Sequence, residues 1–257
     1  MGFKLRDISF AYGPKEVLRA VSITLEPGRF YGVIGPNGCG KTTLLDLMVG
    51  HQPLAAGEIQ YNRKVLATYS RRQLSREIAL VPQNFYINFP YTAREIVMMG
   101  RYPYIPRFAR PSPEDHAVVD GIMEQTETLV FRNRRVTDLS GGERQRVVFA
   151  RALAQDTPVL FLDEATSNLD INHTLSLMKV VRQRMTSGGR TVVAVLQDVN
   201  LAAMYCDELI FMQKGQIHTR GDTDVVLNPD TLKAVFDVET DIVFNPYSES
   251  KQVAFKK

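Results

Sequence analysis

The stretch Phe30-Tyr31-Gly32-Val33-Ile34-Gly35-Pro36-Asn37-Gly38-Cys39-Gly40-Lys41-Thr42-Thr43 carries the chain from an apolar strand into a helix. Its second part fits the pattern G-x-x-x-x-G-K-[ST], and the helical pattern 44–49 follows. Glycines here let backbone N–H groups turn inward around phosphate oxygens, and the helix start adds a favourable field. We therefore predict a phosphate-binding loop formed by Gly35, Pro36, Asn37, Gly38, Cys39, Gly40, Lys41, Thr42 and Thr43.

Two side chains of this loop have separate expected roles. Lys41 would neutralise the β- and γ-phosphates of a nucleotide, and the Thr42 hydroxyl would bind Mg²⁺. The simpler alternative is a glycine-rich turn that binds nothing. The strand before the loop and the helix after it favour the phosphate-binding interpretation.

A second apolar run, Val159-Leu160-Phe161-Leu162, ends in two carboxylates. Sheets of α/β proteins bind ligands at the carboxyl ends of their strands, so this end is a candidate site. Asp163 would hold Mg²⁺ directly or through water, and Glu164 would act as general base on a water molecule. Taken alone, two carboxylates at the end of a strand are usually exposed to solvent and have no catalytic role. Together with the loop around Lys41 it indicates nucleotide chemistry.

Similar short apolar runs recur along the chain with helical patterns between them. Such runs are typical of parallel strands covered on both faces, at 30–34, 78–81, 159–162 and 192–196. The first sixty residues differ, because Val21, Ile23 and Leu25 alternate as in half-buried antiparallel strands. The fold class predicted from these patterns is α/β, with a parallel sheet and an N-terminal antiparallel part.

Strand patterns are missing from about 84 to 153, where capping boxes mark helix starts instead. These are Thr92-Ala93-Arg94-Glu95, Ser112-Pro113-Glu114-Asp115 and Ser140-Gly141-Gly142-Glu143. Gly100 is expected to close the first helix, and 228–236 predicts another short helix. We expect one domain over 1–257. It would comprise a core of 1–85 and 155–225, a helical subdomain of 86–154 and a C-terminal extension of 226–257.

Composition excludes several classes of protein. With 257 residues, 44% hydrophobic and 23% charged, the chain is expected to fold rather than to be disordered. The longest apolar run, Leu201–Cys206, is far shorter than a membrane-spanning helix needs, and the first residues do not resemble a signal peptide. We therefore expect a cytosolic chain that does not cross a bilayer. Cys39 and Cys206 are too few for a disulfide framework or a zinc site. A net charge of +3 does not indicate nucleic-acid binding.

The string Leu139-Ser140-Gly141-Gly142-Glu143 distinguishes between families of phosphate-loop proteins. It resembles the signature of the ATP-binding cassette (ABC) family. The likeness spans nearly the whole chain in the family's order: Tyr12, the phosphate loop, Gln83, the signature, Asp163-Glu164 and Ser167-Asn168-Leu169-Asp170. A capped helix start with two glycines and a hydroxyl also suits an anion on physical grounds.

The resemblance implies a phosphate-loop NTPase core with a RecA-like parallel sheet and an inserted helical subdomain, using ATP and Mg²⁺. It implies a head-to-tail dimer in which Ser140, Gly141 and Gly142 meet the γ-phosphate bound by a second copy. Tyr12 would stack on adenine. Gln83 would contact Mg²⁺ and the attacking water, and would sense the membrane partner.

Met99-Gly100-Arg101-Tyr102-Pro103-Tyr104 further resembles the branch that serves iron-siderophore, haem and cobalamin importers. The implied function is the ATPase subunit of such an importer, peripheral at the cytoplasmic face of the bacterial inner membrane. The implied partners are two transmembrane permease subunits and, indirectly, a substrate-binding protein, without nucleic acid. The alternative is a soluble ABC ATPase acting on ribosomes or nucleic acid, which usually has two cassettes or a long coiled-coil insertion. A GTPase or small-molecule kinase would have no use for the signature.

Two features remain. Seven aromatic residues crowd into 84–108, namely Phe85, Tyr86, Phe89, Tyr91, Tyr102, Tyr104 and Phe108. They either pack within the chain or form an interface, and we favour an interface for part of them.

Gln197 stands where the family pattern has a histidine that contacts the γ-phosphate. An amide donates a hydrogen bond but carries no charge, which predicts near-normal ATP affinity with slow hydrolysis. Either the residue was introduced to trap the bound state, or other groups compensate for it.

Overall fold

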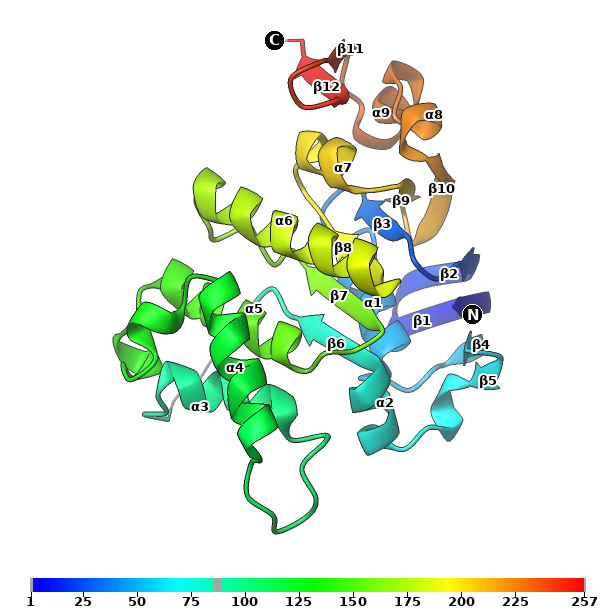
Figure 1. Cartoon of the computed structure of the whole chain (residues 1–257). Helices are drawn as coiled ribbons and strands as arrows, with labels where there is room; N and C mark the ends of the chain where they lie inside the picture. The colour runs from blue at the N-terminus through cyan, green and yellow to red at the C-terminus, as the bar shows by residue number, and fades with distance from the viewer. Residues whose placement is uncertain (1, 86–88, 257) are drawn as a thin grey trace. The chain divides into compact units, whose positions relative to one another are not determined.

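The computed structural model describes residues 2–85 and 89–256 (Figure 1). Its contacts divide the chain into two compact units. Unit 1 consists of residues 1–69 and 191–257, and unit 2 consists of residues 70–190.

The N-terminal part of unit 1 is an antiparallel sheet. Its strand order is β2 (Lys15–Leu25), β1 (Phe3–Tyr12), β4 (Ala56–Tyr61) and β5 (Lys64–Val65), followed by a 3₁₀ turn over Leu66–Thr68. Val21, Ile23 and Leu25 are all buried, as their alternation predicts. The expected antiparallel N-terminal part is therefore confirmed.

A parallel sheet forms the centre of unit 1. In it β3 (Phe30–Ile34) lies between β8 (Thr191–Val195) and β9 (Glu208–Gln213) and runs parallel to both. Every residue of β3 and β8 is buried, which explains why their sequences are apolar without alternation. The strand β10 (Gln216–Asp222) pairs antiparallel with β9. Helices α1 (Lys41–Val49) and α7 (Val199–Tyr205) follow β3 and β8.

The strands β9 and β10 were not predicted. A charged residue, Glu208, begins β9 and is only 5% exposed. Its carboxylate pairs with Arg29 at 3.1 Å and with Arg220 at 3.5 Å. Since these partners come from distant parts of the sequence, the burial of Glu208 is not visible in the local pattern.

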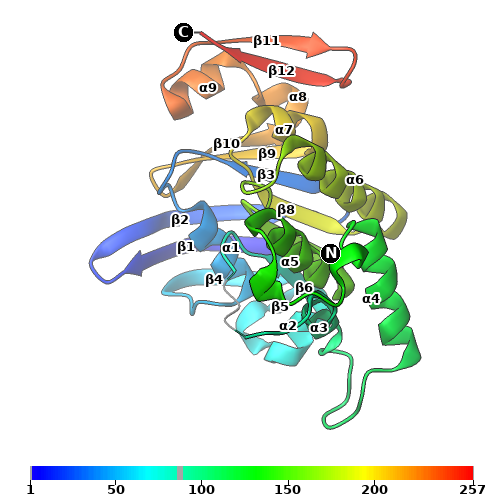
Figure 2. The same cartoon turned by 90° about the vertical axis from the view of Figure 1, so that its left-hand side faces the viewer.

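Unit 1 ends in two helices and a hairpin. Helix α8 (Thr223–Val226) precedes α9 (Pro229–Phe236), which confirms the short helix predicted at the C-terminal end. The antiparallel strands β11 (Thr240–Asn245) and β12 (Ser250–Phe255) form a hairpin that was not predicted (Figure 2). The side chain of Asn200 on α7 accepts from Val253 N at 2.7 Å and donates to Val253 O at 3.3 Å.

Unit 2 contains a parallel strand pair and a group of helices. After α2 (Arg71–Glu77), the strand β6 (Ile78–Val81) pairs in parallel with β7 (Val159–Asp163). The helices α3 (Ala93–Met98), α4 (Pro113–Gln125) and α5 (Gly141–Ala154) pack on one another, and α6 (Ile171–Gly188) follows β7 (Figures 1 and 2). Within the described residues 89–153 the only β pairing is one bridge, Thr92 with Arg135.

All three predicted capping boxes are present, at the starts of α3, α4 and α5. Gly100 does not close α3 as predicted, because α3 ends at Met98 and Gly100 lies in a 3₁₀ turn over Met99–Arg101. A Cβ on Gly100 would lie 2.3 Å from the carbonyl oxygen of Arg151. The glycine is therefore needed for the close approach of this turn to α5.

Candidate nucleotide site

The phosphate loop of unit 1 joins β3 to α1, and two of its glycines are required by the backbone conformation and packing of the loop. Gly40 is the residue before α1 and has φ of 104°, in the left-handed region that favours glycine. A Cβ on Gly35 would lie 2.2 Å from the carbonyl oxygen of Met212 on β9. The loop thus packs directly against the neighbouring strand, while Asn37 and Gly38 at its tip are exposed.

Lys41 is held over the loop. Its ammonium group donates to Gly35 O at 2.8 Å and to Pro36 O at 3.0 Å, and the residue is only 5% exposed. Thr42 is exposed, whereas Thr43 is buried. Cys39, two positions before Lys41, is a buried free thiol whose pKa is raised by burial. Lys41 and Thr42 are therefore the residues whose polar groups can meet a phosphate and its metal ion.

Two more predicted residues belong to unit 1. Tyr12 ends β1, is 48% exposed, and its ring packs edge-on against Phe10 with centroids 4.9 Å apart. About half of the Tyr12 surface is thus accessible. Gln197 is exposed and follows β8, whose end is tied to β3 by Leu196 N donating to Val33 O at 3.2 Å. Gln197 and the phosphate loop therefore leave the parallel sheet at the same edge.

In unit 2, β7 places Asp163 and Glu164 at its carboxyl end. Both residues are largely buried, at 7% and 8% exposure. Gln83 follows the neighbouring strand β6, and its side-chain amide donates to Glu164 Oε2 at 2.5 Å. The parallel pairing of β6 with β7 brings these residues together. In this arrangement the amide orients one oxygen of the Glu164 carboxylate.

The signature forms the start of α5. Ser140 Oγ accepts from Glu143 N at 3.3 Å, and Ser140 N donates to Glu143 Oε2 at 2.8 Å. This backbone hydrogen bond lowers the pKa of Glu143, with a further contribution from the neighbouring Arg134. The N–H groups of the first turn, including those of Gly141 and Gly142, have no acceptor within the helix. An anion can therefore bind at this helix start.

Sequence reasoning missed one residue that positions the signature. Gln145 is 6% exposed, and its amide donates to Ala165 O at 2.9 Å. A Cβ on Gly142 would lie 3.6 Å from Asn168 O. The signature helix therefore packs against the segment that follows Asp163-Glu164. A polar residue on the apolar face of α5 is the signal that could have revealed it.

The oxygen donors of these segments suit Mg²⁺. Mg²⁺ in nucleotide sites takes one or two carboxylates together with substrate phosphates and waters. Thr42 offers a hydroxyl, Asp163 a carboxylate and Gln83 an amide oxygen. In the described part of the chain, no group of three or more His, Cys, Asp or Glu residues could hold a metal ion. A hydroxyl, a carboxylate and an amide oxygen are each donor types that Mg²⁺ accepts.

The aromatic residues of 84–108 divide into two groups. Phe89, Tyr91, Tyr102 and Phe108 are exposed, at 42% or more. Tyr104 is partly buried and donates its hydroxyl to Gln155 O at 2.9 Å. Phe85 lies under the guanidinium of Arg151 at 4.1 Å, and Tyr86 lies outside the described residues. The prediction that part of this group forms an interface stays a prediction.

The parallel sheet, the phosphate loop and the strand-end carboxylates define a phosphate-loop nucleotide-binding protein. The capped signature helix adds the feature that separates one family from the rest. The chain belongs to the ABC transporter family, whose sequence model matches residues 18–167.

Individual relatives agree with this assignment. The chain is 44% identical over 230 residues to the cobalamin import ATP-binding protein BtuD of Halobacterium salinarum, covering 90% of this chain and 57% of the relative. It is 37% identical to the hemin import ATP-binding protein HmuV of Thermobifida fusca, covering 94% and 84%. This chain therefore spans a little more than half the length of the cobalamin relative.

Among solved structures, a metal-chelate type ABC transporter in an inward-facing conformation superimposes with a TM-score of 0.83 at 29% identity, covering 99% of this chain and 96% of that chain. The predicted fold and the predicted likeness to importers of metal chelates are confirmed. No helix within the described residues is both long and apolar enough to span a membrane.

Proposed function

We propose that this chain is the ATP-hydrolysing subunit of an importer for a metal chelate of the iron-siderophore, haem or cobalamin kind. The observation that carries the proposal is the start of α5, where Ser140 and Glu143 cap a helix that presents Gly141 and Gly142. Other phosphate-loop enzymes have no use for such a second anion site. The names of the cobalamin, hemin and metal-chelate relatives support the choice of cargo.

In the proposed reaction, Lys41 leaves the carbonyls of Gly35 and Pro36 and binds the β- and γ-phosphates of ATP. Thr42, Asp163 and Gln83 would hold Mg²⁺, which would neutralise charge on the phosphates. Glu164 takes a proton from the water whose oxygen attacks the γ-phosphorus. The new P–O bond forms as the bond from the γ-phosphorus to the oxygen that bridges it to the β-phosphate breaks, which gives ADP and inorganic phosphate. Tyr12 stacks on the adenine ring.

Gln83 has a second role in this scheme. Its amide N–H donates to Glu164 Oε2 at 2.5 Å and so orients the carboxylate that takes the proton from water. The oxygen of the same amide would hold Mg²⁺. Gln83 would therefore orient the base and hold the metal ion with different atoms of one side chain.

The proposed partners are a second copy of the chain and two membrane permease subunits, with a substrate-binding protein acting through the permease. Ser140, Gly141 and Gly142 would bind the γ-phosphate held by the second copy, in a head-to-tail dimer. The exposed Phe89, Tyr91, Tyr102 and Phe108 would contact the permease, which would hold the chain at the cytoplasmic face of the membrane. In the sequence, 86–154 would be the helical subdomain inserted into the core of 1–85 and 155–225, and 226–257 would be the C-terminal extension.

The test is transport by the assembled complex. The chain would be purified with a permease encoded beside it and placed in vesicles with the matching binding protein and a labelled chelate. We expect uptake that requires ATP and Mg²⁺ and is lost in Lys41→Ala, while the complex still assembles. ATP-dependent uptake that persists in Lys41→Ala would contradict the proposal, as would a chain that associates with ribosomes or DNA instead of a permease.

A further inference from the structure

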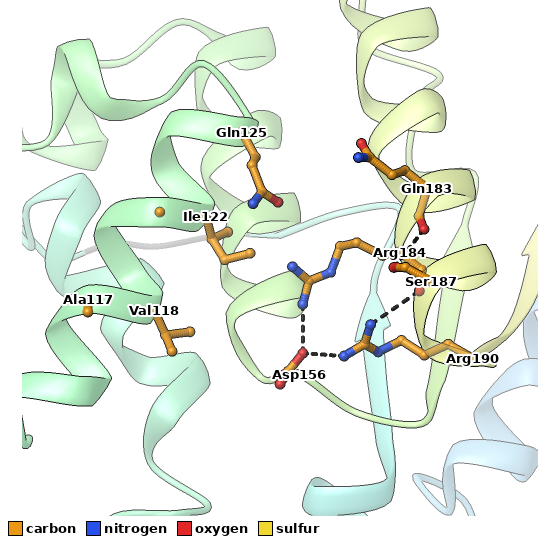
Figure 3. Close-up of a pocket in the computed structure, with 10 residues that line it drawn as sticks. Ala117, Val118, Ile122, Gln125, Asp156, Gln183, Arg184, Ser187 and Arg190 are labelled. Atoms are coloured by element: carbon orange, nitrogen blue, oxygen red, sulfur yellow. Dashed lines mark hydrogen bonds and ion pairs between the residues drawn. The ribbon is translucent and has the colours of Figure 1, made fainter.

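A cavity in unit 2 has no role in the function proposed above. Its volume is about 550 Å³, within the usual range of small-molecule sites. It is lined by residues of α4, by Asp156 in the loop after α5, and by residues at the end of α6 (Figure 3). None of the residues that line it belongs to the nucleotide site.

The cavity contains an excess of positive charge. Arg184 and Arg190 both donate to the same oxygen, Asp156 Oδ1, each at 2.6 Å (Figure 3). Two guanidinium groups thus share one carboxylate, which leaves the group with one net positive charge. Burial, and then the neighbouring charge of Arg190, lower the pKa of Arg184. A second anion would relieve this repulsion and could accept further N–H groups of the pair.

The charged group is held in place by its surroundings. The side chain of Gln155 donates to Ser75 O at 2.6 Å and to Ile78 O at 2.8 Å, which fixes the loop that carries Asp156. Arg190 also donates to Arg184 O at 3.2 Å, at the end of α6. An anion that enters the cavity therefore meets donors that are already oriented, and ordering them costs little at the moment of binding.

A glycine in the wall provides a second, independent observation. Gly121 lies inside α4, where glycine costs about 1 kcal/mol relative to alanine. A Cβ built on Gly121 would have no atom within 4 Å, so no neighbour in the fold requires its absence. At Gly100, by contrast, the backbone of α5 leaves no room for a Cβ. The space over Gly121 is therefore open to an occupant of the cavity.

The remaining lining sets the kind of occupant. Val118 and Ile122 of α4 project toward the cavity, while Gln125 and Gln183 face each other across it (Figure 3). Val118 is half-buried and Ile122 is buried, so the apolar side chains of the lining lie on α4. The arrangement offers an apolar surface on one side and two arginines on the other.

We propose that this cavity binds a small organic anion, with one carboxylate or phosphate monoester group on a short apolar chain. The acidic group lies against Arg184 and Arg190, and the apolar chain lies over Gly121 against Val118 and Ile122. The site is separate from ATP binding, so it provides a place where a metabolite can act on the subunit.

The experiment is a titration of the full chain followed by the methyl NMR signals of Val118 and Ile122. The probes are hexanoate, hexyl phosphate and, as a neutral control, hexanol. We expect saturable shifts with one or both anions, with a Kd of about 1 mM or lower, and binding of hexanol at least about tenfold weaker. A preference between the two anions identifies the acidic group.

Matched variants locate the binding. Gly121→Leu places a side chain where the apolar chain of the ligand would lie and should weaken binding at least about tenfold, whereas Glu124→Leu, an exposed position on the same helix outside the lining, should leave the shifts unchanged. Gly121→Ala serves as the folding control and should raise the melting temperature. Arg184→Gln should weaken anion binding about tenfold. Equal binding of hexanol, full binding by Gly121→Leu, or no saturable shift with either anion would overturn the proposal.

Discussion

Replacing Gln197 with histidine is expected to raise the rate of ATP hydrolysis by about tenfold. Gln197 leaves the sheet at the edge where the phosphate loop begins, because Leu196 N is bonded to Val33 O. Its neutral amide can contribute a hydrogen bond of about 1 kcal/mol, whereas a charged donor contributes about 1.5–3 kcal/mol. The difference of about 0.5–2 kcal/mol corresponds to a change in rate of roughly 2- to 30-fold, and it is largest in the transition state, where charge develops.

The assay is steady-state ATP hydrolysis by the complex at saturating Mg-ATP, together with equilibrium binding of a labelled ATP analogue. Gln197→His should change kcat while the affinity for the analogue changes by no more than about threefold, because the added interaction belongs mainly to the transition state. The hydrolysis rate of this variant should also fall as the pH rises through the pKa of the new histidine. The parent chain should not show this decrease.

Two controls accompany this variant. Gln197→Ala removes the amide donor and should lower the rate about fivefold. Gln252→His places the same new side chain on β12 and should leave the rate unchanged. If Gln197→His hydrolyses ATP no faster than the parent chain, the reasoning that assigns position 197 to the γ-phosphate is refuted.

Four further predictions follow from the same structure. Lys41→Ala should abolish ATP hydrolysis and greatly weaken nucleotide binding, measured with a fluorescent ATP analogue, and retained turnover would refute the role of Lys41. Glu164→Gln should accumulate an ATP-bound dimer, detected by light scattering in the presence of permease, and a monomer at saturating ATP would count against a shared site. Gly100→Ala should destabilise the fold by about 1–3 kcal/mol in urea titration, since its Cβ would meet Arg151 O at 2.3 Å, and an unchanged midpoint would contradict the close packing. The pKa of Glu143 is lowered in the folded chain, so its contribution to stability is present above the ordinary value of 4.5 and is lost as the pH falls through the folded value. Glu143→Gln keeps the capping box but cannot titrate, so its melting temperature should fall less steeply at acidic pH than that of the parent chain.

Local signals in the sequence were sufficient for much of the fold and for the order of the motifs. The strands β3 and β6 match their apolar runs, and the helix starts at Thr92, Ser112 and Ser140 follow from capping boxes that involve residues three apart. Such signals depend on neighbours in the chain, so sequence reasoning can identify them without knowledge of tertiary contacts.

The features that were missed depend on distant contacts. The start of β9 is buried because Arg29 and Arg220 neutralise Glu208. Gly100 appeared to be a helix terminator, although the backbone at Arg151 is what requires it. In the site, the hydrogen bond from Gln83 to Glu164 joins residues 81 positions apart, and no pattern in the sequence specifies its geometry.

The contact between Asn200 and Val253 has a consequence for the solubility of the chain. A two-stranded hairpin exposes unpaired N–H and C=O groups along its outer edges, and such edges promote association between molecules. By bonding to both the N–H and the C=O of Val253, the Asn200 amide imitates the backbone of a third strand at that point. A side chain thereby blocks the middle of β12 from pairing with another molecule, while the short strand length limits what remains exposed.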